Sequence, residues 1–145
     1  MAVSATHTGW HYDPDNSRLN FYYRGTRVGH INGSGSLALA DGGTVTQASN
    51  KSTGVTLSTN SGQITMDDAN LADDTEISFV VTNTNVAATD VVIVNHGSAG
   101  TMGAYVVQAS EIGSETFEVS VKNVSGGTLG EAIVINFVVI KGSSS

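Results

Sequence analysis

The sequence predicts an all-β protein, namely an antiparallel β-sandwich or jelly roll of about eight strands preceded by an N-terminal β-hairpin arm. Three observations support this fold class. The 145 residues favour Gly, Ser, Thr, Val and Asn and include one proline, a composition typical of short strands joined by many turns. Short apolar runs recur at strand-like spacing, separated by turn signals such as those at 95–97 and 125–127. Helix formers are scarce throughout.

The first 31 residues are predicted to form an attachment arm. Residues 18–24 have strand character, Gly25 supplies a turn, and residues 26–31 provide the returning strand of a hairpin. Five of the nine aromatic residues lie within the first 23 positions. An isolated hairpin is only marginally stable in water, so this one needs a surface to lie on.

The body is predicted to span residues 44–141, after a Gly/Ser-rich link at 32–43 and before a flexible tail at 142–145. Within it, residues 76–83 and 116–123 alternate between apolar and polar, as half-buried strands of an antiparallel sheet do. The expected strands are 44–49, 54–58, 62–66, 76–83, 90–95, 104–110, 116–123 and 132–141.

Two further runs, 91–94 and 133–140, are apolar on both faces and therefore need cover on both sides. A body of about 100 residues has little room for such strands, so a subunit interface is expected to supply the missing cover. We predict a homo-oligomer with Val134, Val138 and Ile140 at its interface.

The charge pattern narrows the classes of partner. The net charge is −7, which argues against binding nucleic acid through its phosphates. Residues 1–40 carry three arginines against two aspartates, a net of +1, whereas residues 41–145 carry three lysines against eleven acids, a net of −8. No apolar run is long enough to span a membrane, and the first residues lack the features of a signal peptide, so we expect a soluble chain made in a cytoplasm.

No catalytic residue, cofactor or metal is predicted. The chain has no cysteine, and the nearest approach to a nucleophile elbow, Gly33-Ser-Gly35, has neither the spacing nor the following helix. Asp13 with Asp15, and Asp67 with Asp68, place oxygen ligands close together. Turns and solvated loops explain both pairs more simply, although the sequence leaves open whether either holds an ion.

The aromatic and arginine cluster near the N-terminus is the most informative feature. Aromatic residues and arginine are enriched in interface cores, and here they crowd a segment too short to fold alone. Three explanations remain open: docking onto a partner protein, packing onto the chain's own body or a trimer stem, and stacking on nucleic acid. For the first, the predicted docking residues are Trp10, Tyr12, Arg18, Phe21, Tyr22, Tyr23, Arg24 and Arg27.

Several segments resemble known virion proteins. Residues 10–31 resemble the N-terminal arm of small virion proteins of tailed bacteriophages. Residues 43–57, 62–66 and 131–141 are similar to a β-domain repeated in phage head-decoration, knob and fibre proteins. The resemblance implies a homotrimer on the virion surface, assembled in the host cytoplasm, whose arms hold the major capsid protein or another virion protein.

Two functions follow as expectations. The first is a capsid decoration or cement protein that binds the phage head through its arm and stabilises the shell through many copies. The alternative is a tail fibre or adhesin module that binds a host-surface glycan. An enzyme is disfavoured because no carboxylate pair has a cleft around it, and neither nucleic acid nor a membrane is expected as a partner.

Overall fold

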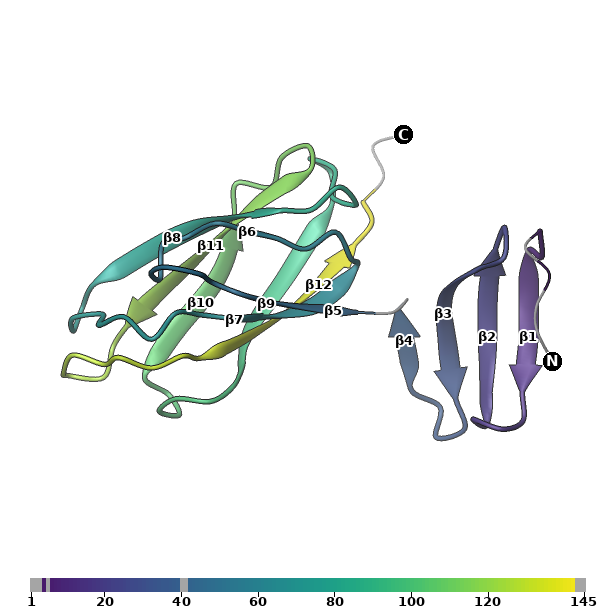
Figure 1. The fold of residues 1–145 in the computed structure, drawn as a ribbon, viewed down its shortest axis with the longest axis horizontal. Helices are drawn as coiled ribbons and strands as arrows, with labels where there is room; N and C mark the ends of the chain where they lie inside the picture. The colour runs from purple at the N-terminus through teal and green to yellow at the C-terminus, as the bar shows by residue number, and fades with distance from the viewer. Residues whose placement is uncertain (1–3, 5, 40–41, 143–145) are drawn as a thin grey trace. The chain divides into compact units, whose positions relative to one another are not determined.

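The computed structural model describes residues 4, 6–39 and 42–142, and these ranges contain strands, turns and loops but no helix. The chain divides into two units, residues 1–42 and residues 43–145. Twelve strands form three four-stranded sheets, one in the first unit and two in the second (Figure 1). The prediction of an all-β protein is therefore confirmed.

The first unit is a single antiparallel sheet in which consecutive strands are neighbours. Its central hairpin turns at Arg24 and Gly25, with φ angles of 48° and 78°. Positive φ at both central residues is the geometry that matches the twist of a two-residue hairpin. The strands are β1 (Gly9–Asp13), β2 (Arg18–Tyr23), β3 (Thr26–Asn32) and β4 (Leu37–Leu39).

The Gly/Ser-rich link predicted at residues 32–43 contains a strand, β4. The Asn32 side chain accepts hydrogen bonds from the backbone N–H groups of Ser34 and Ser36, at 3.2 and 2.9 Å, and so closes a tight turn after β3. That turn returns the chain along β3, where Leu37 pairs with Ile31. The Gly/Ser stretch is therefore a turn inside the sheet, and the arm has four strands instead of two. Residues 40–41 of the predicted link lie outside the described residues.

The second unit contains the eight strands expected there, arranged in two sheets. Their ends differ from the predicted ones by a few residues at most, as is usual at strand ends. One sheet has the order β5 (Gly43–Thr46), β7 (Ser61–Thr65), β12 (Val134–Ile140), β9 (Val91–Ser98). The other has the order β10 (Tyr105–Ser110), β11 (Thr116–Asn123), β8 (Glu76–Thr82), β6 (Val55–Thr56).

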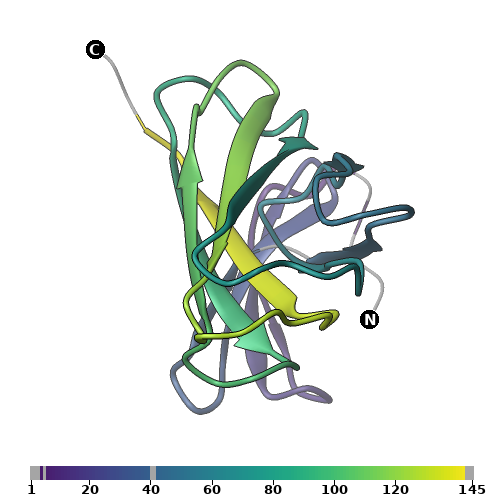
Figure 2. The ribbon, with the colours of Figure 1, turned by 90° about the vertical axis from the view of Figure 1, so that its left-hand side faces the viewer.

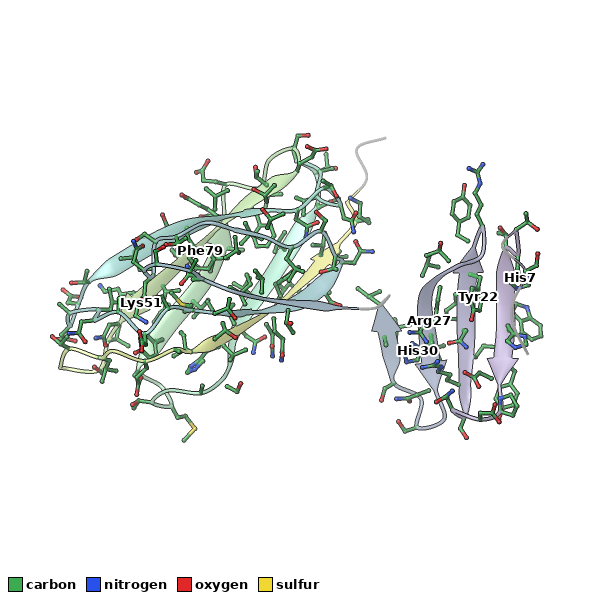
Figure 3. All side chains as sticks on the ribbon, in the orientation of Figure 1. His7, Tyr22, Arg27, His30, Lys51 and Phe79 are labelled. Atoms are coloured by element: carbon green, nitrogen blue, oxygen red, sulfur yellow. The ribbon has the colours of Figure 1, made fainter. Side chains whose placement is uncertain are left out.

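One hydrophobic core lies between these two sheets. Phe79 and Phe117 reach it from one sheet, and Ile135 and Phe137 reach it from the other. The rings of Phe117 and Phe137 meet across the layers with centroids 5.6 Å apart. The two layers can be followed from another side in Figure 2, and Phe79 is labelled inside the unit in Figure 3. The alternation predicted for residues 76–83 and 116–123 places the rings of Phe79 and Phe117 inward.

The prediction that the sheets are antiparallel throughout is wrong at two edges. β5 pairs with β7, and β6 pairs with β8, in parallel. The chain leaves β5 for the opposite sheet, forms β6 there, and returns as β7 beside β5 in the same direction. A strand that comes back after such a crossover runs parallel to its neighbour, whereas a hairpin would make it antiparallel.

A buried carboxylate fastens the end of β12 to the loop after β8. Asp90 accepts hydrogen bonds from the backbone N–H groups of Ala87 (2.8 Å) and Gly142 (3.0 Å) and forms an ion pair with Lys141. The Lys141 ammonium, and after it the Ala87 amide, lower the pKa of Asp90 below its ordinary value. Gly142 is thus held in place, although 142–145 is predicted to be a flexible tail; residues 143–145 lie outside the described part.

Replacing Asp90 with asparagine should destabilise the protein near neutral pH and should make little difference in strong acid. A carboxylate whose pKa is lowered by folding contributes stability above its unfolded pKa of about 4, and this stability is lost as the pH falls through the lowered pKa. Thermal unfolding of Asp90→Asn and the parent chain at about pH 7 and about pH 2 tests this. An equal difference in unfolding temperature at both pH values would contradict the prediction. Asp15→Asn, at an exposed position, is the control.

Candidate interaction surfaces

The pairing register of the first sheet sorts its side chains onto two chemically different faces. Residues that pair directly across strands share a face, and successive residues along a strand alternate between faces. Trp10 pairs with Phe21, Tyr12 pairs with Leu19, and Leu19 also pairs with Ile31. These residues define what we call the apolar face, which consists of Trp10, Tyr12, Leu19, Phe21, Tyr23, Ile31, Leu37 and Leu39.

The apolar face is exposed. The side chains of Trp10 and Leu37 are each 68% exposed, and Tyr23 is 57% exposed. Among the described residues of the first unit, no second layer covers this face, since its four strands form one sheet. Soluble chains rarely leave a contiguous apolar area of this kind open to water unless it contacts a partner. The face is therefore the leading candidate for a protein-binding surface.

The other side of the same sheet, the polar face, carries imidazole, amide and charged groups. His11, Asn20 and His30 lie in one row across three strands, because Asn20 pairs with both histidines. Tyr22 pairs with Arg27 on the same face, and Figure 3 labels Tyr22, Arg27 and His30 on the neighbouring strands β2 and β3. The two faces thus differ in chemistry as well as in exposure.

Several polar atoms on this side are enclosed and have no hydrogen-bond partner among residues 4, 6–39 and 42–142. Asn20 is 2% exposed, and its Oδ1 has none. The same holds for Nδ1 of His30 and Nε2 of His7, whose ring meets that of Tyr22 edge-on at 5.7 Å. An enclosed polar atom without a protein partner is costly, and in folded proteins it is usually satisfied by an ordered water, an ion or a bound ligand.

The acidic turn between β1 and β2 is occupied by its own residues. Asp13 accepts hydrogen bonds from the side chain and backbone of Asn16 and from Nε of Arg18, at 2.9, 3.3 and 3.2 Å. The Asn16 side chain, with Arg18 adding its charge, lowers the pKa of Asp13. Asp15 is exposed beside it. Across residues 4, 6–39 and 42–142, no group of three or more acidic, histidine or cysteine side chains is placed to hold a metal ion.

The second acidic pair, Asp67 and Asp68, lies beside a buried lysine. Lys51 is 4% exposed and donates hydrogen bonds from Nζ to the backbone oxygens of Asp67 (2.5 Å) and Glu131 (2.6 Å). Burial lowers the pKa of Lys51, and the neighbouring carboxylates of Asp67, Asp68 and Glu131 oppose that change. The Lys51 ammonium group is thus the cation that the backbone oxygens of Asp67 and Glu131 already bind. Its positive charge would repel a metal ion at the same place.

Glu131 itself belongs to a structural cluster at the turn after β9. Its carboxylate accepts hydrogen bonds from the N–H and Oγ1 of Thr101 and from the hydroxyl of Tyr105, at 3.0, 2.8 and 2.9 Å. These bonds lower the pKa of Glu131, while burial and then Glu131 raise the pKa of Tyr105 to about 12. Neither group changes protonation near neutral pH, which does not suit general acid or base catalysis. A cleft of about 350 Å³ beside them is lined by 96–100 and Met102.

The residues predicted to dock onto a partner do not form one surface. Trp10, Tyr12, Phe21 and Tyr23 lie on the apolar face, whereas Arg18, Tyr22 and Arg27 lie on the polar face. Arg24 sits in the hairpin turn with its guanidinium 5.4 Å from the ring centroid of Tyr23. The aliphatic members of the apolar face, Leu19, Ile31, Leu37 and Leu39, are not among the predicted docking residues. The alternation of residues 37–39 is the sequence signal for the last two.

The predicted oligomer interface is apolar over part of its length. On the outer surface of the β12 sheet, Val138 pairs with Ile93, and Ile140 pairs with Val91. Ile93 is 50% exposed, and Val91 and Ile140 are exposed to a similar extent. These four residues form what we call the β9–β12 patch. The third predicted residue, Val134, lies at the far end of β12 opposite Thr65 and Ser98, away from the patch.

Known proteins add no information here. No family model, no curated protein and no solved structure matches the chain. A search of the described residues also finds no helix long and apolar enough to cross a membrane.

Trp10, the single tryptophan of the chain, should report directly on the apolar face. Because its indole is largely exposed, we expect the long-wavelength emission of a water-exposed tryptophan and ready quenching by acrylamide. When a partner covers the face, the emission should shift to shorter wavelength and the quenching should fall. A short-wavelength, quencher-resistant emission from the chain in dilute solution would contradict the exposed position.

Proposed function

We propose that this chain is a structural protein of a bacteriophage virion, a capsid decoration or cement protein that attaches through the apolar face of its N-terminal sheet. The observation that carries the proposal is that this four-stranded sheet has an open aromatic and aliphatic face. A sheet with an apolar face buries it against another element in a stable structure. The partner is the major capsid protein or another virion protein, and the chain acts without catalysis.

The composition of the apolar face favours a protein as the occupant. Tryptophan, tyrosine and phenylalanine are the residues enriched in the centres of protein interfaces, and three exposed rings of this kind lie on one sheet. The Arg24 side chain at the edge offers a charged group of the kind found at interface rims. Many copies on one shell would add up individually modest contacts into stable attachment.

The body fits the second part of the proposal, a β-sandwich that associates with its own copies. Its two sheets share a core, and its outer surfaces are unequal. The outer side of β8 and β11 is polar, for example where Ser78 donates to Glu118 at 3.1 Å, whereas the β9–β12 patch is apolar. We propose that this patch forms the contact between subunits, and that the assembly is a homotrimer.

Two substitutions test the attachment surface against its opposite side. Tyr12→Ser and Tyr23→Ser should each weaken attachment by ~2 kcal/mol or more, about 30-fold, which is the cost of removing an interface hot spot. His11→Ser, next to Tyr12 but on the polar face, should leave attachment unchanged. The measurement is the binding of each purified protein to virions that lack this chain. The copies bound to heads and to tails are counted separately. Equal losses from His11→Ser and Tyr12→Ser would reject the apolar face.

The subunit contact has its own matched pair of variants. Ile93→Lys should dissociate the oligomer, because it places a charge in the centre of the apolar patch. Val80→Lys introduces the same charge at a valine of similar exposure, 44%, on the outer side of β8 and should leave the oligomer intact. Light-scattering masses of the three proteins decide the matter. A monomeric parent chain, or an Ile93→Lys variant that keeps the parent's mass, would refute this interface.

A further inference from the structure

We propose that the concave end of the polar face, beside the turn between β1 and β2, is a binding site for a neutral saccharide. The cavity there has a volume of about 410 Å³, within the range of ~300–1,000 Å³ typical of small-ligand sites. It is lined by His11, Tyr12, Asp13, Pro14, Asp15, Asn16, Asn20 and Tyr22, of which Tyr12 alone belongs to the apolar face. The site goes beyond the attachment function, because His11, Asn20 and Tyr22, on which the inference rests, lie on the polar face.

The strongest sign of a ligand is Asn20. Its side chain is almost completely enclosed and lines the cavity, yet its Oδ1 accepts no hydrogen bond from any residue that the structure describes. Its cross-strand neighbours are the two histidines of the row defined above, His11 and His30. Because a buried carbonyl oxygen without a donor is costly, the site calls for a molecule that brings a donor to it. A hydroxyl group of a bound ligand supplies such a donor.

The charges around the cavity select a neutral ligand. Two carboxylates, Asp13 and Asp15, would repel a phosphate, sulfate or other anion. A metal cation is equally unsuited, because the Asp13 oxygens already accept hydrogen bonds from Asn16 and Arg18, and the arginine brings a positive charge. Hydroxyl groups can both donate and accept, so a polyhydroxylated molecule matches the carboxylates and the amides together.

The aromatic side chains complete the match to a sugar. The ring of Tyr22 lies between Asn20 and the turn to β3 on the same face of β2, and its edge-on contact with His7 holds it in place. Together with the imidazole of His11 it gives the cavity lining two aromatic rings. A sugar ring has hydroxyl groups at its rim and C–H groups on its faces, so it can use the polar atoms and the aromatic rings at the same time.

Saturation-transfer NMR on the full chain tests the site, with methyl glycosides of glucose, galactose, mannose and N-acetylglucosamine as probes at millimolar concentrations. At least one glycoside should bind. Asn20→Leu, which keeps the side-chain volume but removes the acceptor, should weaken that binding by about tenfold or more. Tyr22→Ser should do the same, whereas Tyr23→Ser, at the adjacent position on the apolar face, should leave it unchanged.

The outcomes separate this inference from the attachment function. Tyr23→Ser should impair attachment and spare glycoside binding, and Tyr22→Ser should impair glycoside binding. If none of the four glycosides binds the parent chain, or if Tyr23→Ser weakens binding as much as Tyr22→Ser does, the saccharide site is refuted while the attachment proposal stands. Should Asn20→Leu fail to fold, the two tyrosine variants still decide between these results.

Discussion

The structure of the N-terminal unit depends on one constraint, namely that a sheet without a second layer has two open faces. Cross-strand pairing places every second side chain on the same side, so the register decides which chemistry each face presents. In this sheet the pairs Trp10 with Phe21 and Leu19 with Ile31 collect the apolar groups, while Asn20 pairs with His11 and His30 on the other side. A shift of one residue between β1 and β2 would mix the two sets and abolish both surfaces.

A β-bulge preserves this separation in β3. Phe21 pairs with Gly29 and Tyr22 pairs with Arg27, so Val28 is the additional residue between the two pairs. In a regular register, Val28 would pair with Tyr22 and Arg27 would pair with Tyr23, so that Arg27 would point to the apolar side. Val28 is accordingly left exposed, at 45%. The bulge thus places the arginine with Tyr22 on the polar face and leaves the aromatic surface uncharged.

Much of the body could be predicted from sequence, because its strands carry strong local signals. The period-two pattern at Phe79 and Phe117 directs both rings to the core. The pairing direction of β5 and β6 could not be predicted, since it depends on which sheet the chain enters after each turn. The same applies to Lys51, whose burial depends on the distant oxygens of Asp67 and Glu131. Exposed lysine is the usual expectation, and the lysine's own neighbours in sequence give no sign of these partners.

The candidate surfaces were harder to predict than the strands. Aromatic composition identifies the segment around residues 10–23, but composition cannot assign Tyr22 and Tyr23 to opposite faces without the register. The same holds for β4. Glycine and serine at 33–36 suggest a link by composition, whereas the hydrogen bonds from Ser34 and Ser36 to the Asn32 side chain make a turn of it.

The two units differ in how much apolar surface each encloses by itself. The body encloses its core within one chain, with Phe117 and Phe137 in contact, so association through the β9–β12 patch adds to a structure that is already complete. The N-terminal sheet buries little apolar surface by itself, so a bound partner would contribute directly to its stability. Folding of the body therefore does not require a partner. In the proposed attachment, by contrast, the N-terminal sheet gains stability when a partner covers its apolar face.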